Sequence, residues 1–416
     1  MNSTSAPFRI FPLLFAALTG TMAMMSYVAV IGPIVRRLGL PEWIAGLSLT
    51  VGGVFWMLLA RWWGRVSDRH GRKRVLLIGL AVFALVYAGL AVGVDVALRG
   101  YAGVTAVAVL LIVTRSLIGA FYAAVPPTAA AAVADNTLPR DRPSAMAKLG
   151  TANALGMVAG PAAAGWLATL SLGGALYAAA VLPALGFLVI AFCLPADQPL
   201  AAEKAALRAQ AAPGQRPRAG LTWWDPRLRH LNLTAFTAMG SVAIAQVLVG
   251  FFSMDRLGLS EAEGARVAGL SLTVVGFALI FSQQFVMRLK SVPPTRWIWL
   301  GALIAALGFS SVTLAHVQSA ILLGYGVGAF GMGMIFPTFQ AMAANAVDSH
   351  EQGAAAGTLA AAQGLGMVVG PLAGTVLYQM APALPYLFVA GGLLILSVGT
   401  VLIRANKAVP ASSQDV

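Results

Sequence analysis

The sequence has a single cysteine and few charged residues. Cys193 stands alone, which excludes an intramolecular disulfide and a metal site built from cysteines. Charged residues make up 10% of the 416 positions and hydrophobic residues 59%. A soluble protein of this length needs far more charged surface. The composition therefore indicates a membrane protein with the lipid bilayer as its main partner.

Several catalytic and nucleotide-binding patterns are also missing. The chain has no G-x-x-x-x-G-K-[S/T] loop, no His-Glu-x-x-His pair and no credible nucleophile elbow. We therefore expect no enzyme activity, no cofactor and no metal. Any active transport has to be driven by a gradient, and a proton moving down the membrane potential supplies about 2.3 kcal/mol per 100 mV.

Long apolar runs are abundant. Each is about the length of a membrane-spanning helix, and none alternates with the period of two that a barrel strand needs. The fold class predicted from them is an all-α membrane protein with twelve transmembrane helices. The runs cover residues 10–35, 41–64, 74–96, 102–127, 144–168, 174–194, 230–253, 265–288, 296–315, 319–343, 354–378 and 384–403.

The net charge is +13, from 27 Lys and Arg against 14 Asp and Glu, and the basic residues lie mainly in the segments between the predicted spans. Most basic residues fall on one side of the predicted spans, including the cluster at 65–74 and the segment after the sixth run. By the positive-inside rule, that side is the cytoplasm. We therefore expect both termini in the cytoplasm, a bacterial inner-membrane location and no nucleic-acid partner.

One long interruption divides the chain. Residues 195–229 are rich in Ala, Pro, Arg and Gln, and a short helix over 200–211 fits within them. The predicted organisation is an N-terminal six-helix bundle (1–194), a cytoplasmic linker (195–229) and a C-terminal six-helix bundle with a short tail (230–416). We expect the protein to be a monomer.

A repeat links the two halves. Leu155–Pro161 and Leu365–Pro371 are nearly identical, and both contain a Gly-x-x-x-Gly-Pro pattern. Small residues one turn apart let two helices approach closely, and proline bends a helix. The predicted conformational residues are Gly156, Gly160, Pro161, Gly366, Gly370 and Pro371. Tight packing with no part in motion is the alternative.

A basic loop follows the second run, from Gly64 to Arg74. Gly64 and Gly71 allow a short turn, while Asp68 can accept hydrogen bonds from Arg69 or Arg72. The loop is either a latch that helps to set the conformational state or a solvated basic loop that only fixes topology.

These motifs resemble those of the major facilitator superfamily. The loop is similar to its G-x-L-a-D-R-x-G-R-K signature, and Arg115-x-x-x-Gly119 to its fourth-helix motif. Gly156-x-x-x-Gly160-Pro161 resembles the motif of the drug:proton antiporter branch. The resemblance implies two pseudo-symmetric six-helix bundles that alternate access to a central site. It also implies that Asp68 helps to hold the outward-open state.

Arg115 lies near the middle of a predicted span, where a charge costs about 2.5–3.5 kcal/mol on insertion scales. It either meets an anionic substrate group, controls a proton-transfer step, or bonds backbone carbonyls at a helix break near Pro126 and Pro127. No acidic residue falls at a span centre; Asp95 and Asp255 are the deepest. The candidate proton-coupling residues are therefore Arg115, Asp95 and Asp255, and a cationic substrate is disfavoured.

In the resembled fold, the first, fourth, seventh and tenth helices line the cavity. The residues expected to bind substrate are polar or aromatic and lie on these helices or beside them: Ser26, Tyr27, Trp56, Arg115, Tyr122, Asn153, Gln246 and Gln340. Serine, threonine and glutamine also bond between helices without contacting a substrate.

The sequence therefore predicts a secondary active exporter coupled to protons. Its substrate is expected to be a neutral, zwitterionic or anionic small organic molecule, such as a siderophore-like metabolite or an antibiotic. The alternatives are a broad-specificity multidrug:proton antiporter, an importer, and a non-transporting sensor on the same fold.

Overall fold

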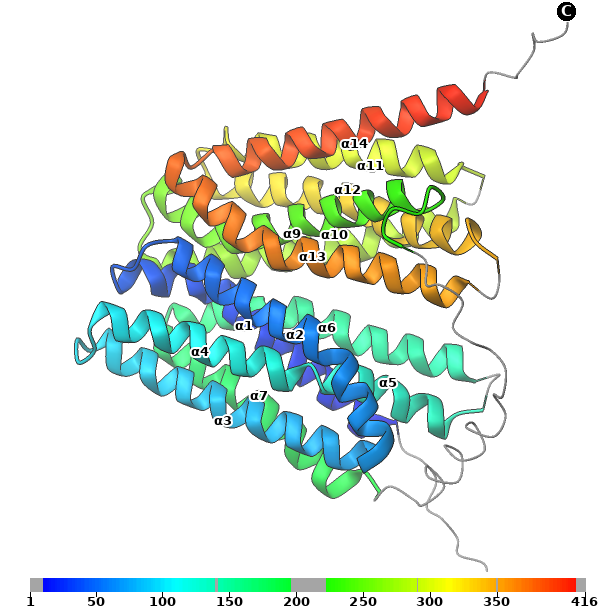
Figure 1. The fold of residues 1–416 in the computed structure, drawn as a ribbon. Coiled ribbons are helices and arrows are strands. Elements are labelled where there is room, and N and C mark those ends of the chain that lie inside the picture. The colour runs from blue at the N-terminus through cyan, green and yellow to red at the C-terminus, as the bar shows by residue number, and fades with distance from the viewer. Residues whose placement is uncertain (1–9, 139–140, 196–221, 290, 349–350, 409–416) are drawn as a thin grey trace, which may run out of the picture. The chain divides into compact units, whose positions relative to one another are not determined.

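The computed structural model describes residues 10–138, 141–195, 222–289, 291–348 and 351–408. Throughout these residues the regular secondary structure is α-helical, as the long apolar runs predicted (Figure 1). The short helix predicted over 200–211 lies outside the described residues. The chain divides into two compact units. The first takes in the described residues of Met1–Arg218 and Ser260–Gly269, and the second those of Ala219–Leu259 and Leu270–Val416.

In the first unit, α1 packs against α6 and α7, and α4 packs against α2 and α3. Its helices are α1 (Phe11–Arg37), α2 (Trp43–His70), α3 (Arg72–Leu98), α4 (Val104–Tyr122), α5 (Val125–Asn136), α6 (Arg142–Ala168) and α7 (Leu172–Cys193). In the second unit, α9 packs against α13, and α11 against α12 and α14. The helices there are α9 (Arg229–Leu257), α11 (Pro294–Val312), α12 (Gln318–Asn345), α13 (Gln352–Met380) and α14 (Leu384–Ala408). Helix α10 (Glu261–Arg288) begins in the first unit and continues in the second.

Eleven stretches of the described chain are long and apolar enough to cross a membrane. The predicted run 144–168 is not among them, although it forms the continuous helix α6. Alanine and glycine make up much of α6, and large aliphatic residues are few, so that its mean hydropathy is low. The small side chains suit close contact with other helices better than contact with lipid.

The run predicted over 102–127 is interrupted. Helix α4 ends at Tyr122 and α5 begins at Val125, and the two together form one of the eleven spans. Pro126 and Pro127 have no N–H to donate to the carbonyls of Tyr122 and Ala123, so a continuous helix would lose both of these bonds. Proline is well tolerated in the first turn of a helix, which is where α5 starts.

The repeated Gly-x-x-x-Gly-Pro segments bring helices into backbone contact. A Cβ added to Gly156 would lie 2.6 Å from the Leu18 carbonyl oxygen, and one on Gly160 would meet the Met22 carbonyl. In the second unit, a Cβ on Gly366 would lie 2.5 Å from the Phe236 carbonyl oxygen. Each unit thus pairs its motif helix closely with the first helix of its repeat, α1 with α6 and α9 with α13.

Candidate substrate site

Arg115 is buried in the first unit, with 3% of its surface exposed. Its guanidinium carbon lies 4.5 Å from the centre of the Tyr27 ring, and Nη1 lies 3.6 Å from the Met24 sulfur. The Nε–H is buried without an acceptor. Within the part of the chain that the structure describes, no carboxylate forms an ion pair with Arg115. Its charge meets an aromatic face and a polarisable sulfur, both of which are weaker partners than an anion.

Glycines allow α2 and α4 to approach closely at the level of Arg115. A Cβ on Gly52 of α2 would lie 3.0 Å from the Arg115 carbonyl oxygen, and one on Gly119 of α4 would collide with the Gly52 backbone. The close approach of α2 leaves the long side chain of Arg115 in the interior of the unit rather than in lipid.

Hydrogen bonds fix the aromatic side of this site. The hydroxyl groups of Tyr27 and Ser48 lie 3.0 Å apart, and the Tyr87 hydroxyl donates to the Ala23 carbonyl at 3.0 Å. Both tyrosines are fully buried. Since the Tyr27 ring is held at its hydroxyl end, its face stays beneath the Arg115 guanidinium.

A second polar cluster joins three helices of the same unit. Thr21 of α1 donates to Oδ1 of Asn153 on α6 at 2.8 Å, and its Oγ1 lies 3.1 Å from the Tyr122 hydroxyl on α4. Asn153 Nδ2 donates to the Leu149 carbonyl at 3.2 Å. Tyr122 is buried, while Thr21 and Asn153 are half-buried. The cluster therefore includes Tyr122 and Asn153, which the sequence predicted, and Thr21, which it did not.

The other predicted binding residues lie in different surroundings. Ser26 donates to the carbonyls of Met22 (2.8 Å) and Gly160 (3.1 Å), a link between α1 and α6. Trp56 packs against a core cluster that includes Trp63 and Val75, and its Nε1–H is buried without an acceptor. In the second unit, Gln246 is half-buried and Gln340 is exposed. Their part in substrate binding stays a prediction.

Arg72 organises the basic loop. Its guanidinium contacts Asp68 at 2.6 Å and Asp135, at the end of α5, at 3.1 Å, and Nη1 donates to the Ser67 hydroxyl. Gly71 has a φ of 93°, a left-handed value that favours glycine, at the junction of α2 and α3. Arg69 is exposed, and Gly64 has open space beside it. The acidic partner that the sequence missed is Asp135, which lies far from the loop in the chain.

The two acidic residues among the proton-coupling candidates, Asp95 and Asp255, each have a polar partner. Asp95 forms an ion pair with Arg99 at 2.8 Å, one turn away on the same helix. Asp255, near the end of α9, accepts a 2.6 Å hydrogen bond from the Tyr378 hydroxyl of α13. Their role in proton coupling stays a prediction.

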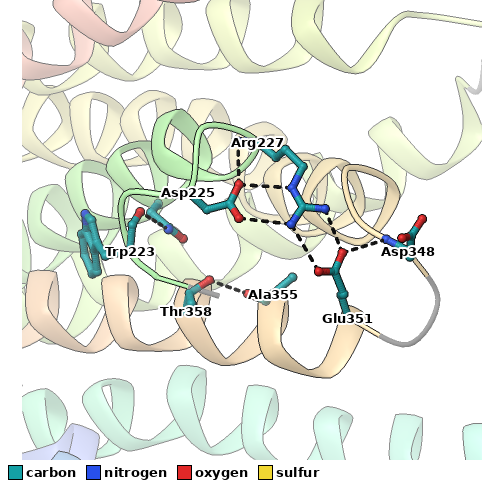
Figure 2. A network of polar contacts seen from close by, with 8 residues as sticks. Trp223, Asp225, Arg227, Asp348, Glu351, Ala355 and Thr358 are labelled. Carbon is teal, nitrogen blue, oxygen red and sulfur yellow. Dashed lines mark hydrogen bonds and ion pairs between the residues drawn. The ribbon is translucent and has the colours of Figure 1, made fainter. Parts of the chain in front are cut away.

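An ion-pair network lies at the start of α9 in the second unit (Figure 2). Arg227 contacts Asp225 at 3.1 Å and Glu351, the residue before α13, at 2.8 Å. Side-chain and backbone hydrogen bonds from Arg227 lower the pKa of Asp225 below its usual value. The hydrogen bond to Glu351 leads the causes that raise the pKa of Arg227. Asp225 and Arg227 are therefore both charged at neutral pH.

Apolar helices that enclose a buried cation and a polar cluster are an arrangement in which a membrane protein can bind a solute. A family model described as the Major Facilitator Superfamily matches residues 10–330 and 268–415. The chain belongs to the major facilitator superfamily, as its motifs predicted.

Several curated relatives are drug-resistance proteins of the exporter branch that the motifs resembled. The tetracycline resistance protein, class C, of Escherichia coli is 28% identical over 351 residues, which cover 80% of this chain and 79% of that protein. Multidrug resistance protein 2 of Bacillus subtilis (strain 168) is 23% identical over 351 residues, which cover 83% of this chain and 82% of that protein. Their names confirm the resemblance to drug exporters.

Solved structures share the fold. The peptide transporter POT in complex with sulfate superposes with a TM-score of 0.73 at 15% sequence identity, covering 98% of this chain and 96% of the other. A bacterial homolog of the human lysosomal transporter Spinster, in an inward-facing and occupied conformation, has a TM-score of 0.71 at 15% identity and covers 96% of both chains.

Proposed function

We propose that the protein is a secondary active exporter that moves a small organic molecule with a negative group out of the cytoplasm. The supporting observation is Arg115, a buried guanidinium with an unpaired Nε–H and no carboxylate partner among the described residues. A buried cation without a counter-ion is costly, and a bound anion would remove that cost. The drug-exporting relatives support the direction of transport.

The proposed topology has twelve spans in two six-helix bundles (1–194 and 230–416) joined by a cytoplasmic linker (195–229). In this arrangement α6 provides the span that its composition alone does not identify. Both termini are proposed to lie in the cytoplasm, and the membrane is proposed to be a bacterial inner membrane; the positive-inside rule, applied to the basic loops, supports this orientation. The two bundles would rock around a central site, with the glycine–proline segments and the Arg72 ion pairs as the moving contacts.

Coupling to protons is part of the proposal, because the sequence has no ATP-binding loop. Arg115, Asp95 and Asp255 are the groups proposed to link the proton to the substrate. A siderophore-like carboxylate or hydroxamate, or an amphiphilic antibiotic with a negative group, has the chemistry that Arg115 can bind.

The test compares the small molecules excreted by strains with and without the gene, using mass spectrometry. We expect one anionic metabolite to accumulate inside the deletion strain. The wild-type gene should restore its export, whereas Arg115→Gln should not. Arg37→Gln, which removes an arginine whose side chain is 61% exposed and which lies outside the proposed site, is the matched control and should export normally. An unchanged set of excreted anions would contradict the proposal.

The second candidate function is a broad multidrug:proton antiporter, favoured by the relatives named for multidrug resistance. On this alternative, the gene would protect a drug-sensitive strain against several unrelated compounds. Ethidium efflux that depends on Asp95 or Asp255 would support it over the export of anions. Resistance confined to anionic compounds would support the first function.

A further inference from the structure

The first unit holds two polar stations on the same two helices. Along α1, Thr21 contacts Tyr122 of α4, whereas Met24 and Tyr27 contact Arg115 of α4. Higher numbers on α1 therefore meet lower numbers on α4, so the helices run antiparallel. We call Arg115, Met24 and Tyr27 the guanidinium station. Thr21, Tyr122 and Asn153 are the amide station.

The donor and the acceptor of each hydrogen bond in the amide station can be assigned. Nδ2 of Asn153 faces the Leu149 carbonyl, which can only accept, so Oδ1 must face Thr21. Thr21 has one proton and donates it to Oδ1, so the Tyr122 hydroxyl has to donate to Thr21. One N–H of the Asn153 amide and a lone pair of the Tyr122 oxygen are left over. The station can therefore bind a neutral group that both donates and accepts, such as an amide or a hydroxyl.

The guanidinium station is closed by a flexible side chain. Met24 is half-buried, and its sulfur is a weak acceptor for Nη1 of Arg115. Methionine changes rotamer readily and tolerates irregular packing. An anionic oxygen that displaces the sulfur would exchange this weak contact for a charge-assisted hydrogen bond.

The separation of the stations follows from helix geometry. Tyr122 and Arg115 are seven residues apart on α4, which is roughly 10 Å along the axis at 1.5 Å per residue. On α1, Thr21 and Tyr27 are six residues apart, roughly 9 Å, so a ligand that runs parallel to the two helices from one station to the other would carry its polar groups roughly 9–10 Å apart. Met24 lies between Thr21 and Tyr27 on α1, so the segment between the two groups meets a thioether and is best apolar.

We propose that the two stations form one binding site for an amphiphilic organic anion. Its negative group would bind Arg115, and a neutral hydrogen-bonding group roughly 10 Å away would bind Thr21, Tyr122 and Asn153. The inference rests on the proposed function for the sign of the substrate charge. It adds a second recognition point and a length requirement, and it makes Thr21 a specificity-determining residue.

The test measures binding to the purified full-length protein in lipid nanodiscs by isothermal titration. The probes are 8-acetamidooctanoate, whose extended length matches the spacing, the shorter 4-acetamidobutanoate, octanoate, which lacks the amide, and N-octylacetamide, which lacks the carboxylate. We expect 8-acetamidooctanoate to bind about tenfold more tightly than each of the others, since each of them loses one polar contact.

Variants separate the stations. Arg115→Gln should remove the preference for 8-acetamidooctanoate over N-octylacetamide and leave its preference over octanoate. Thr21→Val should remove the preference for 8-acetamidooctanoate over octanoate and leave its preference over N-octylacetamide, because it breaks the amide station without touching Arg115. Thr19→Val is the matched control: the Thr19 hydroxyl donates to the Phe15 and Ala16 carbonyls of its own helix, and both preferences should remain. Size-exclusion profiles and melting temperatures identify any variant that fails to fold.

The outcomes are distinguishable. If both variants weaken all probes equally, or if no probe binds the wild type, the two-station site is wrong. If the crossed pattern holds but no anion is exported by cells, the site stands and the export function fails. If Arg115→Gln shows its expected loss while Thr21→Val leaves every preference intact, Arg115 binds anions and the amide station is only a packing contact, which overturns the inference.

Discussion

Arg227 and Glu351 are 124 residues apart in the chain, yet Nη1 of the arginine donates to Oε2 of the glutamate at 2.8 Å. Arg227 lies two residues before α9, and Glu351 immediately precedes α13. The pair therefore joins the starts of two helices that also pack along their length (Figure 2).

Reversing this ion pair tests its contribution to folding. Arg227→Glu and Glu351→Arg should each lower the melting temperature, because like charges then face each other. The double variant should recover part of the loss, as a double-mutant cycle requires of interacting groups. Differential scanning fluorimetry in detergent at low and high salt measures this, and salt should weaken the effect of an exposed pair. Strictly additive losses would show that the two side chains do not interact.

The pH dependence of this network follows from Asp225. Its pKa is lower in the folded protein than in the unfolded chain, so its stabilising contribution is complete above the ordinary carboxyl pKa of about 3.9 and disappears as the pH falls through the lowered value. The difference in melting temperature between the wild type and Asp225→Asn should therefore stay constant from pH 7 to about pH 5 and shrink only in stronger acid. Asp348→Asn is the control, because Asp348 contacts Glu351 through its backbone N–H, which the substitution keeps. A difference that shrinks already near pH 6 would contradict the assignment.

The repeated glycines predict that adding a single methyl group at a close helix contact lowers the stability of the protein. A Cβ at Gly366 would press on backbone atoms of α9, which cannot rotate away, so Gly366→Ala should destabilise the protein by about 1–3 kcal/mol. Gly357 lies on the same helix with open space beside it, and Gly357→Ala should be neutral or mildly stabilising. Melting temperatures and transport rates of the two variants provide the comparison. Equal effects would mean that the helices separate at no cost.

Asp135 should matter more to the basic loop than Asp68. The Asp68 side chain is 60% exposed, whereas that of Asp135 is 31% exposed and bridges from α5 to Arg72 at the start of α3. Because water screens Asp68 more strongly, Asp135→Asn should impair transport more than Asp68→Asn. The Arg72→Gln variant should resemble Asp135→Asn. Initial rates of efflux at equal protein levels give the measure, and a larger effect of Asp68→Asn would contradict this order.

The sequence predicted the helical class, the family and the close helix pairs because each has a local signature. Apolar length marks a span, and a glycine repeat marks a close contact. It named Tyr122 and Asn153 as substrate-binding residues, and the structure brings the two into one polar cluster. It missed Thr21, because a threonine on an apolar helix looks the same in sequence whether it bonds its own backbone or another helix. Asp135 was missed because its partner Arg72 lies 63 residues away and no spacing rule connects α5 with α3.

The break between α4 and α5 shows a second feature that the sequence pattern does not predict. Pro126 and Pro127 signal that hydrogen bonds are lost, but they do not say whether the helix ends or bends. The structure ends α4 at Tyr122, the residue whose hydroxyl completes the amide station. The identity of the residue at a helix end depends on tertiary contacts, and these are absent from a local pattern.

The composition of α6 bears on how the protein is made. Its alanines and glycines leave it less apolar than the eleven recognised spans, so lipid alone favours its insertion only weakly. Gly156 and Gly160 lie against α1, which the ribosome completes more than a hundred residues earlier. Membrane insertion of α6 is thus expected to depend on a helix already in place. Enlarging Gly156 or Gly160, which would push α6 away from the α1 backbone, should therefore lower the yield of inserted protein.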